Sequence, residues 1–150
     1  MLAKLQKYDL SIAVLSGGKS SRMNYEDKGL MKYNGISVLS RIVKLSCKYS
    51  NDVFIIANNN MEDYEKLHPN LYSDILDNYQ GPLSGIYTAL SKCKNSYVII
   101  LPCDGPFIKE DYFEKLINSE TDQPILVAKT GDRLQPVYAR LDASLKEDLK

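Results

Sequence analysis

Short apolar runs alternate with amphipathic segments along the chain, and this alternation predicts its secondary structure. Apolar side chains, many of them β-branched, follow one another at residues 12–15, 52–57 and 97–101, a pattern typical of strands covered on both faces. A weaker strand is predicted at residues 72–76. Helical spacing of apolar side chains predicts helices from Ser37 to near Tyr49, at residues 61–67, from about Leu83 onwards, and at residues 110–117.

The last third of the chain breaks this alternation. Residues 124–129 and 134–140 are predicted to be two strands of a hairpin that turns at residues 130–132, and residues 142–150 are predicted to begin a final helix. Strands that alternate with helices favour a mostly parallel, doubly wound sheet with right-handed crossovers, here with an antiparallel strand late in the chain. The sequence contains neither an internal repeat nor a low-complexity linker, so residues 1–150 are expected to form a single domain.

Charge and cysteine content exclude several classes of protein. The 19 basic and 19 acidic residues give a formal net charge of zero, which argues against a nucleic-acid partner. The three cysteines are odd in number and never form a C-x-x-C pair, so neither a disulfide framework nor a zinc site is indicated. No apolar run approaches the roughly 18 residues of a membrane span, and no signal-peptide centre is present. We therefore expect a cytoplasmic protein with reduced thiols and no membrane partner.

The segment after the first predicted strand is a candidate phosphate site. Gly17 and Gly18 leave their amide groups open to a ligand, and successive N–H groups of this kind form an anion nest. Arg22 and Lys28 follow within a dozen residues and could neutralise a polyanion such as a nucleoside triphosphate. A glycine pair after a strand is often an ordinary turn. The P-loop is excluded because Ala13 stands where its motif requires glycine.

A second candidate residue follows the most apolar strand. Asp104 lies in the segment Pro102–Cys103–Asp104–Gly105–Pro106, directly after residues 97–101. Open α/β sheets bind their ligands at the carboxyl ends of parallel strands. Asp104 is therefore the leading candidate for a metal ligand.

Four separated motifs carry a resemblance to a known family. LSGGKSSRM at residues 15–23 is similar to the L-A-G-G-x-S-x-R-M signature of Rossmann-like nucleotidyltransferases, and DKGL at 27–30 extends it. QGPLSGI at 80–86, LPCDGPFI at 101–108 and RLQPVYA at 133–139 follow in the family's order. Together they resemble the molybdenum cofactor guanylyltransferases over nearly the whole chain. The resemblance implies a three-layer Rossmann-like α/β fold with a mostly parallel sheet and a late antiparallel strand.

The resemblance also implies an activity and a set of site residues. Members transfer GMP from GTP to the phosphate of molybdopterin that carries molybdenum, with Mg²⁺ as cofactor and pyrophosphate as the second product. Molybdoenzymes or other cofactor-assembly proteins would be further partners. Nucleotide binding is assigned to Leu15, Ser16, Gly17, Gly18, Lys28, Asp77, Gly81, Pro82, Gly85 and Asp104. The catalytic residues would be Arg22, Lys28 and Asp104, with Asp104 as the magnesium ligand.

Within this set the resemblance gives each part of the nucleotide its own contacts. The backbone of residues 15–17 would hold the nucleotide, and Lys28 would reach its phosphates. Asp77 would lie at the guanosine end, and Gly81, Pro82 and Gly85 would shape the wall beside the base.

Three departures from the family pattern bear on these expectations. Asn24 replaces a glycine after R-M, so we expect Asn24 to adopt a left-handed conformation. Ile56 stands where the family often has an asparagine, with Asn58 close by. The family continues for several tens of residues past the Q-P motif, whereas this sequence ends at Lys150, so the family's C-terminal segment is expected to be missing.

Two classes of alternative remain open at this stage. A molybdopterin cytidylyltransferase or a sugar-phosphate nucleotidyltransferase would share the glycine loop and the aspartate, although D-K-G-L and Q-G-P-L-S-G favour guanine. A nucleotide-binding relative that has lost catalysis would share them too. Comparing the binding of GTP, CTP and UTP distinguishes a guanylyltransferase from the other nucleotidyltransferases. An assay of pyrophosphate release distinguishes an active enzyme from a relative that only binds nucleotides.

Overall fold

The computed structural model of the chain describes residues 9–16, 28–76, 81–105 and 108–149. A six-stranded sheet with the order β5-β4-β1-β6-β8-β7 forms the centre of the described part. Its strands are β1 (Leu10–Leu15), β4 (Asp52–Ile56), β5 (Leu71–Tyr72), β6 (Tyr97–Pro102), β7 (Ile125–Thr130) and β8 (Arg133–Asp142). The pairs β4–β5, β1–β4 and β1–β6 are parallel, whereas β8 runs antiparallel to both β6 and β7. The predicted parallel sheet with a late antiparallel strand is confirmed.

Strand β1 occupies the centre of the sheet and determines where a site can form. Leu15 at its end pairs in register with Ile56 of β4 on one side and with Pro102 of β6 on the other. The segments that leave β1, β4 and β6 therefore emerge side by side at one edge of the sheet. This carboxyl edge is where open α/β sheets bind ligands.

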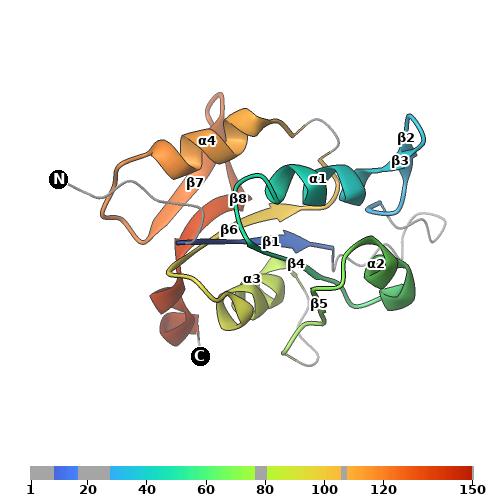
Figure 1. The fold of residues 1–150 in the computed structure, drawn as a ribbon. Coiled ribbons are helices and arrows are strands. Elements are labelled where there is room, and N and C mark those ends of the chain that lie inside the picture. Colours follow the sequence, from blue (N-terminus) through green and yellow to red (C-terminus); the bar gives the residue numbers. More distant parts are fainter. Residues whose placement is uncertain (1–8, 17–27, 77–80, 106–107, 150) are drawn as a thin grey trace.

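Helices cover both faces of the sheet, which makes three layers (Figure 1). Helices α1 (Val38–Ser46) and α4 (Glu110–Asn118) lie over one face, and α3 (Pro82–Lys92) lies over the other. Successive side chains of β1 point to opposite faces of the sheet. Ile12 and Val14 pack in the core under α1 and α4, whereas Ala13 packs in the core under α3. Helix α2 (Met61–Leu67) adds Tyr64 to the first of these cores.

Local sequence signals account for the start of α1. Asn34 and Gly35 have φ angles of 53° and 81° and form the turn of a small hairpin, β2 (Lys32–Tyr33) with β3 (Ile36–Ser37). Ser37 then caps α1, because its Oγ accepts a hydrogen bond of 3.1 Å from the backbone N–H of Ser40. The helix predicted from Ser37 onwards is therefore confirmed at its start, with Ser37 as the residue before its first turn.

Two predicted elements end differently in the structure. The strand predicted at 72–76 is only β5, Leu71–Tyr72, because the N–H groups of Asp74 and Ile75 donate to the side chains of Asn58 and Thr88 instead of a neighbouring strand. Helix α1 ends at Ser46, three residues before the predicted end, and gives way to i to i+3 turns.

The predicted final helix is a 3₁₀ helix, η1 (Ala143–Leu149). At its start the N–H of Ala143 donates to the carbonyl of Ser96, and that of Ser144 donates to the Asp142 carboxylate at 2.9 Å. These two N–H groups have no acceptor within the helix, so the contacts satisfy the donors at its N-terminus. Leu145 still packs on the core under α3, so η1 completes that layer.

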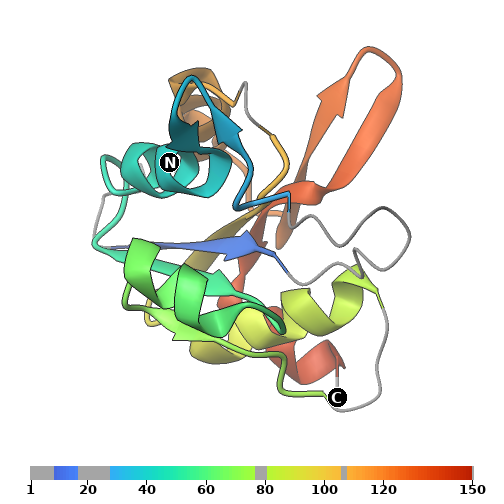
Figure 2. The same cartoon turned by 90° about the vertical axis from the view of Figure 1, so that its right-hand side faces the viewer.

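The β7–β8 hairpin confirms the predicted late pair of strands and extends beyond the body of the protein. Its outer part stands clear of the helices, as Figure 2 shows. A change of register between Val127 and Ala128 separates this outer part from the part that pairs in the sheet. None of the helices that the structure describes is long and apolar enough to cross a membrane. Cys47, Cys93 and Cys103 form no disulfide among the described residues.

Candidate active site

Two backbone hydrogen bonds hold the chain where it leaves β1. The N–H of Ser16 donates to the carbonyl of Ile56 at 2.7 Å, and the N–H of Cys103 donates to the carbonyl of Leu15 at 3.0 Å. The ends of β4, β1 and β6 are thereby tied together beyond the regular ladder. Asp104 follows Cys103 directly and so lies beside the exit of β1.

Lys28 and Asp104 meet at this edge. The Lys28 Nζ lies 3.9 Å from Oδ2 of Asp104, and the two side chains are 70% and 48% exposed. An ion pair so open to water contributes little to folding stability. Both charges are therefore available to a ligand, as the resemblance implies for the phosphate-binding lysine and the metal-binding aspartate.

Several predicted residues fall outside the described part of the chain. These are Gly17, Gly18, Arg22 and Asp77, together with the left-handed conformation expected at Asn24. Their roles stay predictions.

The predicted base-side residues lie at the start of α3, and one of them contacts the end of β1. Gly81 has a φ of 119°, a conformation that side-chain-bearing residues rarely adopt, and Pro82 opens the helix. Gly85 is buried, and a Cβ built on it would lie 3.5 Å from Cδ2 of Leu15. The structure thus brings Gly85 together with Leu15, as expected if both line one nucleotide.

Asp74 is a candidate residue that the sequence did not single out. Its Oδ2 accepts a hydrogen bond of 2.8 Å from the Asn58 amide, while its N–H donates to Asn58 Oδ1 at 2.9 Å. Its other oxygen, Oδ1, is buried without a hydrogen-bond partner in the described part of the chain and would lie 4.0 Å from a Cβ on Gly85. Because β5 ends at Tyr72, Asp74 is the first carboxylate beyond that strand.

The departure at Ile56 is explained by packing. Ile56 is 1% exposed and belongs to the core under α3, so its side chain does not reach the edge. Asn58 is exposed and instead orients the Asp74 carboxylate. An amide is therefore still present near the end of β4, two residues later than in the family pattern.

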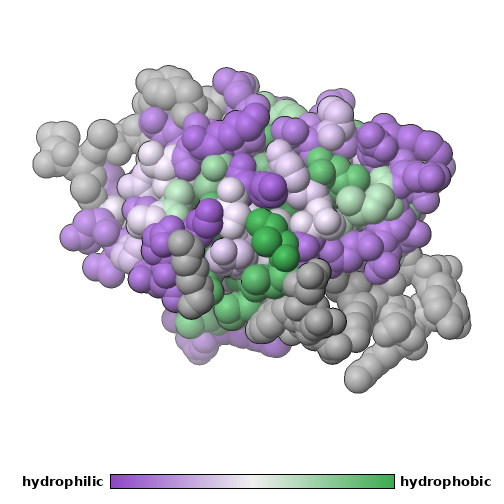
Figure 3. All heavy atoms as spheres, turned by 90° about the horizontal axis from the view of Figure 1, so that it is seen from below, coloured by the Kyte–Doolittle hydropathy of each residue, from purple (hydrophilic) through white to green (hydrophobic). Residues whose placement is uncertain are grey.

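The face that carries α3 has hydrophobic side chains gathered within a largely hydrophilic surface (Figure 3). Exposed apolar residues near the start of α3 include Ile75, Leu76 and Leu83, which are 44%, 38% and 44% exposed. A purine base has two apolar faces, so surface of this kind beside Gly85 suits the base better than the phosphates.

Tyr138 of β8 packs against the turn that carries Asp104. A Cβ at residue 105 would lie 2.9 Å from the Tyr138 hydroxyl, so a larger residue there would displace that hydroxyl. The ring of Tyr138 meets that of Tyr112 edge to face, with centroids 5.5 Å apart. Burial, the Asp104 carboxylate and Cys103 raise the pKa of Tyr138, which keeps its hydroxyl protonated beside the site.

The donor set at this edge fits Mg²⁺ only in combination with a phosphate ligand. Among the described residues, no group of three or more His, Cys, Asp or Glu side chains could enclose a metal ion. Mg²⁺ is commonly held by one or two carboxylates together with substrate phosphates and waters. A single half-exposed carboxylate, Asp104, beside a lysine matches that arrangement.

A mostly parallel α/β sheet that presents a lysine and a carboxylate beside the exit of its central strand is the arrangement expected of a nucleotidyltransferase. Residues 12–150 match the family described as "MobA-like NTP transferase domain", and the chain belongs to this family.

Named relatives agree with this assignment. The chain is 42% identical to a probable molybdenum cofactor guanylyltransferase of Clostridium perfringens over 137 residues, which cover 91% of this chain and 68% of the relative. It is 35% identical to the molybdenum cofactor guanylyltransferase of Haemophilus influenzae over 143 residues, or 94% of this chain and 74% of the relative.

The fold is shared with a solved structure. Molybdopterin-guanine dinucleotide biosynthesis protein A from Archaeoglobus fulgidus superposes with a TM-score of 0.72 at 21% identity, and the match covers 93% of this chain and 70% of that one.

Proposed function

We propose that the chain transfers GMP from GTP to the phosphate of molybdenum-bearing molybdopterin and releases pyrophosphate. The observation that carries this proposal is the 3.9 Å approach of Lys28 to Asp104 beside the end of β1. Family membership and the names of the relatives support the choice of reaction. The proposal includes GTP and molybdopterin as substrates and a cytoplasmic setting.

The phosphates of GTP would lie over the end of β1. The backbone of Leu15 and Ser16, continued by Gly17 and Gly18, would face them, and consecutive amide groups suit an anion. Lys28 would contact the phosphates, with Arg22 as a second counter-charge. Asp104 would hold Mg²⁺ against the same phosphates, and the ion, when bound, supplies positive charge to the phosphate oxygens.

The proposed reaction is a displacement at the α-phosphorus. An oxygen of the acceptor phosphate forms a bond to the α-phosphorus while the bond from that phosphorus to the bridging oxygen of the β-phosphate breaks. The electron pair leaves with pyrophosphate, and nothing is oxidised or reduced. Lys28 and Arg22 would neutralise the charge that grows on the leaving group, so catalysis depends on positioning and preset charge.

The guanosine would lie towards α3. Gly81, Pro82 and Gly85 would form the wall beside the base, and Asp77 is the acidic residue that the family resemblance assigns to this end. We add Asp74 to the proposal, because its buried Oδ1 has no hydrogen-bond partner among the described residues and can accept from a donor on the ligand. Replacing each aspartate by asparagine and comparing the two losses of GTP affinity tests which of them contacts the nucleoside.

Two measurements test the proposed function. Calorimetric titration with GTP, CTP and UTP in the presence of Mg²⁺ should show the tightest binding for GTP; tighter binding of CTP would favour a cytidylyltransferase. Release of pyrophosphate from GTP, Mg²⁺ and molybdenum-bearing molybdopterin tests the reaction itself. Binding of GTP without any release would mean a nucleotide-binding relative that does not catalyse.

A further inference from the structure

Four residues meet behind the carboxyl edge of the sheet, and we refer to them as the Tyr64 cluster: Ser16, Gly29, Tyr64 and Cys103. The Ser16 hydroxyl donates a hydrogen bond of 2.6 Å to the Tyr64 hydroxyl oxygen. A Cβ built on Gly29 would lie 2.9 Å from that oxygen, 3.2 Å from Cys103 Sγ and 3.2 Å from Ser16 Oγ. The four residues come from three separate segments and from α2.

Each of the three segments carries a proposed site residue next to its member of the cluster. Ser16 follows Leu15 and precedes Gly17, Gly29 follows Lys28, and Cys103 precedes Asp104. The phosphate-facing backbone, the lysine and the carboxylate therefore each lie one peptide bond from the same packed group of atoms. Any shift within the cluster moves these groups relative to one another.

The cluster is held rigidly. Tyr64 is 0% exposed and Cys103 8% exposed, and Gly29 is also buried. The Gly29 carbonyl accepts from the N–H of Leu39 at 3.1 Å, which fixes this residue to α1. Tight packing and hydrogen bonds of this kind resist small displacements, because close-packed interiors have few voids to move into.

We propose that Tyr64 is a positioning residue that, through Ser16, Gly29 and Cys103, sets the spacing between Lys28 and Asp104 for a bound nucleoside triphosphate. The inference rests on the proposed function, since it needs a reaction at that edge. Lys28 and Asp104 are exposed, and their ion pair is too weak to fix the distance between them. That distance therefore has to be set by the buried residues next to them in the chain. Tyr64 does not need to touch the substrate for this role.

The first test removes one hydroxyl at a time. Tyr64→Phe and Ser16→Ala each delete the hydrogen bond without changing the fold of the backbone, and each should lower kcat roughly three- to tenfold at saturating GTP, the range expected for one hydrogen bond. The double variant should lose less than the sum of the two single losses, because the two changes share one bond. If kcat of both single variants equals that of the unmodified chain, the proposal is wrong.

A matched control separates positioning from folding stability. Tyr112→Phe removes another tyrosine hydroxyl with a short hydrogen bond. The Tyr112 hydroxyl, on α4, donates to the carbonyl of Ile100 at 2.7 Å, whereas that of Tyr64 accepts from Ser16. Tyr112→Phe should lower Tm by an amount similar to Tyr64→Phe while kcat stays unchanged. If Tyr64→Phe and Tyr112→Phe lost kcat equally, the effect of Tyr64 would be general destabilisation and the proposal would be wrong.

The second test uses the close approach to Gly29. Gly29→Ala places a methyl group 2.9 Å from the Tyr64 oxygen, so the variant should lose kcat. Adding Tyr64→Phe removes that oxygen, and the pair Gly29→Ala/Tyr64→Phe should have a higher kcat than Gly29→Ala alone. A pair that is no better than Gly29→Ala contradicts the proposal even if one of the variants folds poorly.

Failure of the inference is distinguishable from failure of the proposed function. If the unmodified chain neither binds GTP nor releases pyrophosphate, the proposed function fails. If it does both and the Tyr64 and Ser16 variants match it, the function stands and the positioning role is wrong.

Discussion

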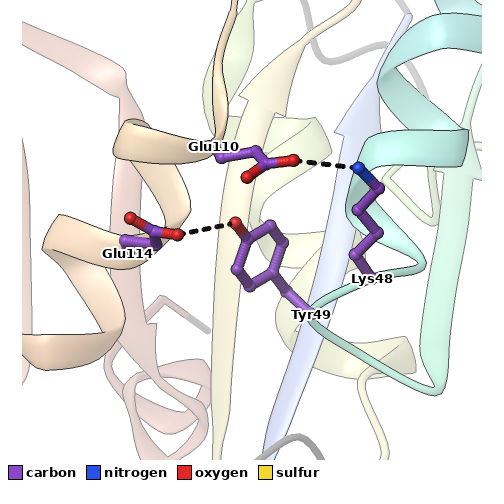
Figure 4. A network of polar contacts seen from close by, with 4 residues as sticks. All are labelled: Lys48, Tyr49, Glu110 and Glu114. Carbon is purple, nitrogen blue, oxygen red and sulfur yellow. Dashed lines mark hydrogen bonds and ion pairs between the residues drawn. The ribbon is translucent and has the colours of Figure 1, made fainter.

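Lys28 Nζ lies 3.9 Å from Asp104 Oδ2, and neither residue belongs to a helix or strand. Asp104 is placed at this edge by the parallel pairing of β6 with β1. Lys28 is placed there by its neighbour Gly29, which bonds to α1 and packs against Cys103. A second exposed pair, Lys48 with Glu110 at 2.9 Å, joins the end of α1 to α4 away from this edge (Figure 4). The two pairs resemble each other in exposure and differ in place, so they can be compared experimentally.

Replacing Lys28 with methionine should separate activity from stability. We expect kcat/KM for GTP to fall roughly 100-fold, because a preset positive charge on the phosphates is lost. The free energy of unfolding should change by less than about 0.5 kcal/mol, because the ion pair with Asp104 is exposed. Steady-state kinetics and urea denaturation measure the two quantities.

The control is Lys48→Met, which breaks the second pair. This change should leave kcat/KM as it is and alter stability as little as Lys28→Met does, since both lysines are largely exposed. A similar loss of activity in both variants would argue that the net charge of the protein, rather than the place of Lys28, is responsible.

Asp104→Asn should abolish most pyrophosphate release and weaken the response to Mg²⁺. Asparagine keeps the size of the side chain but removes the negative charge that a divalent cation requires. We expect a loss in kcat of roughly 100- to 1000-fold and a higher Mg²⁺ concentration for half-maximal rate. An unchanged magnesium dependence would mean that Asp104 does not bind the metal.

The order of elements was predictable because each depends on a local signal. The buried run in β6, the cap at Ser37 and the turn at Asn34–Gly35 all act within a few residues. The short length of β5 depends on hydrogen bonds to distant partners, Asn58 and Thr88. Such partners are invisible in a local pattern.

The site was predictable where residues follow directly after strands. Asp104 and Leu15 fall where motif and strand end coincide, and the structure places them at one edge. Asp74 was missed because the predicted strand ran past its true end at Tyr72 and so placed residue 74 inside the strand. Tyr64 lies in a short charged helix, and nothing in that helix indicates a contact with Ser16, 48 positions earlier.

Arg140 should contribute to stability through the end of α4. It is 4% exposed, and its Nη1 donates to the carbonyls of Leu116 at 2.6 Å and Ser119 at 3.3 Å. Its guanidinium also lies 5.3 Å from the centre of the Tyr97 ring. Arg140→Met would remove both of these donors, including the one to the carbonyl of buried Leu116, and we expect a loss of about 2–3 kcal/mol in the free energy of unfolding, measured by urea denaturation.

Arg140→Lys is the informative comparison for this residue. Lysine keeps the charge near the helix C-terminus but supplies a single donor group in place of the planar guanidinium. It should therefore recover part of the loss. If Arg140→Met is as stable as the unmodified chain, the two hydrogen bonds make no net contribution to the free energy of unfolding.

Tyr49 should make the stability depend on pH in alkaline solution. Its hydroxyl donates to Glu114 at 3.2 Å (Figure 4). Its ring stacks on Phe113. Burial, with smaller effects of Glu110, Glu114 and Asp111, raises the pKa of Tyr49 from 10.0 to about 12. Below pH 10 the unfolded and folded chains both keep the proton, so the contribution of Tyr49 is fully present.

Between pH 10 and about 12 the unfolded chain loses the Tyr49 proton while the folded chain keeps it, so the free energy of unfolding should fall across this window. Tyr49→Phe should make the fall less steep, and urea denaturation at several alkaline pH values measures the slope. Glu114→Gln removes one negative charge and keeps an acceptor, so it should lower the pKa of Tyr49 and narrow the window. Identical slopes for the unmodified chain and Tyr49→Phe would show that this tyrosine ionises equally in both states.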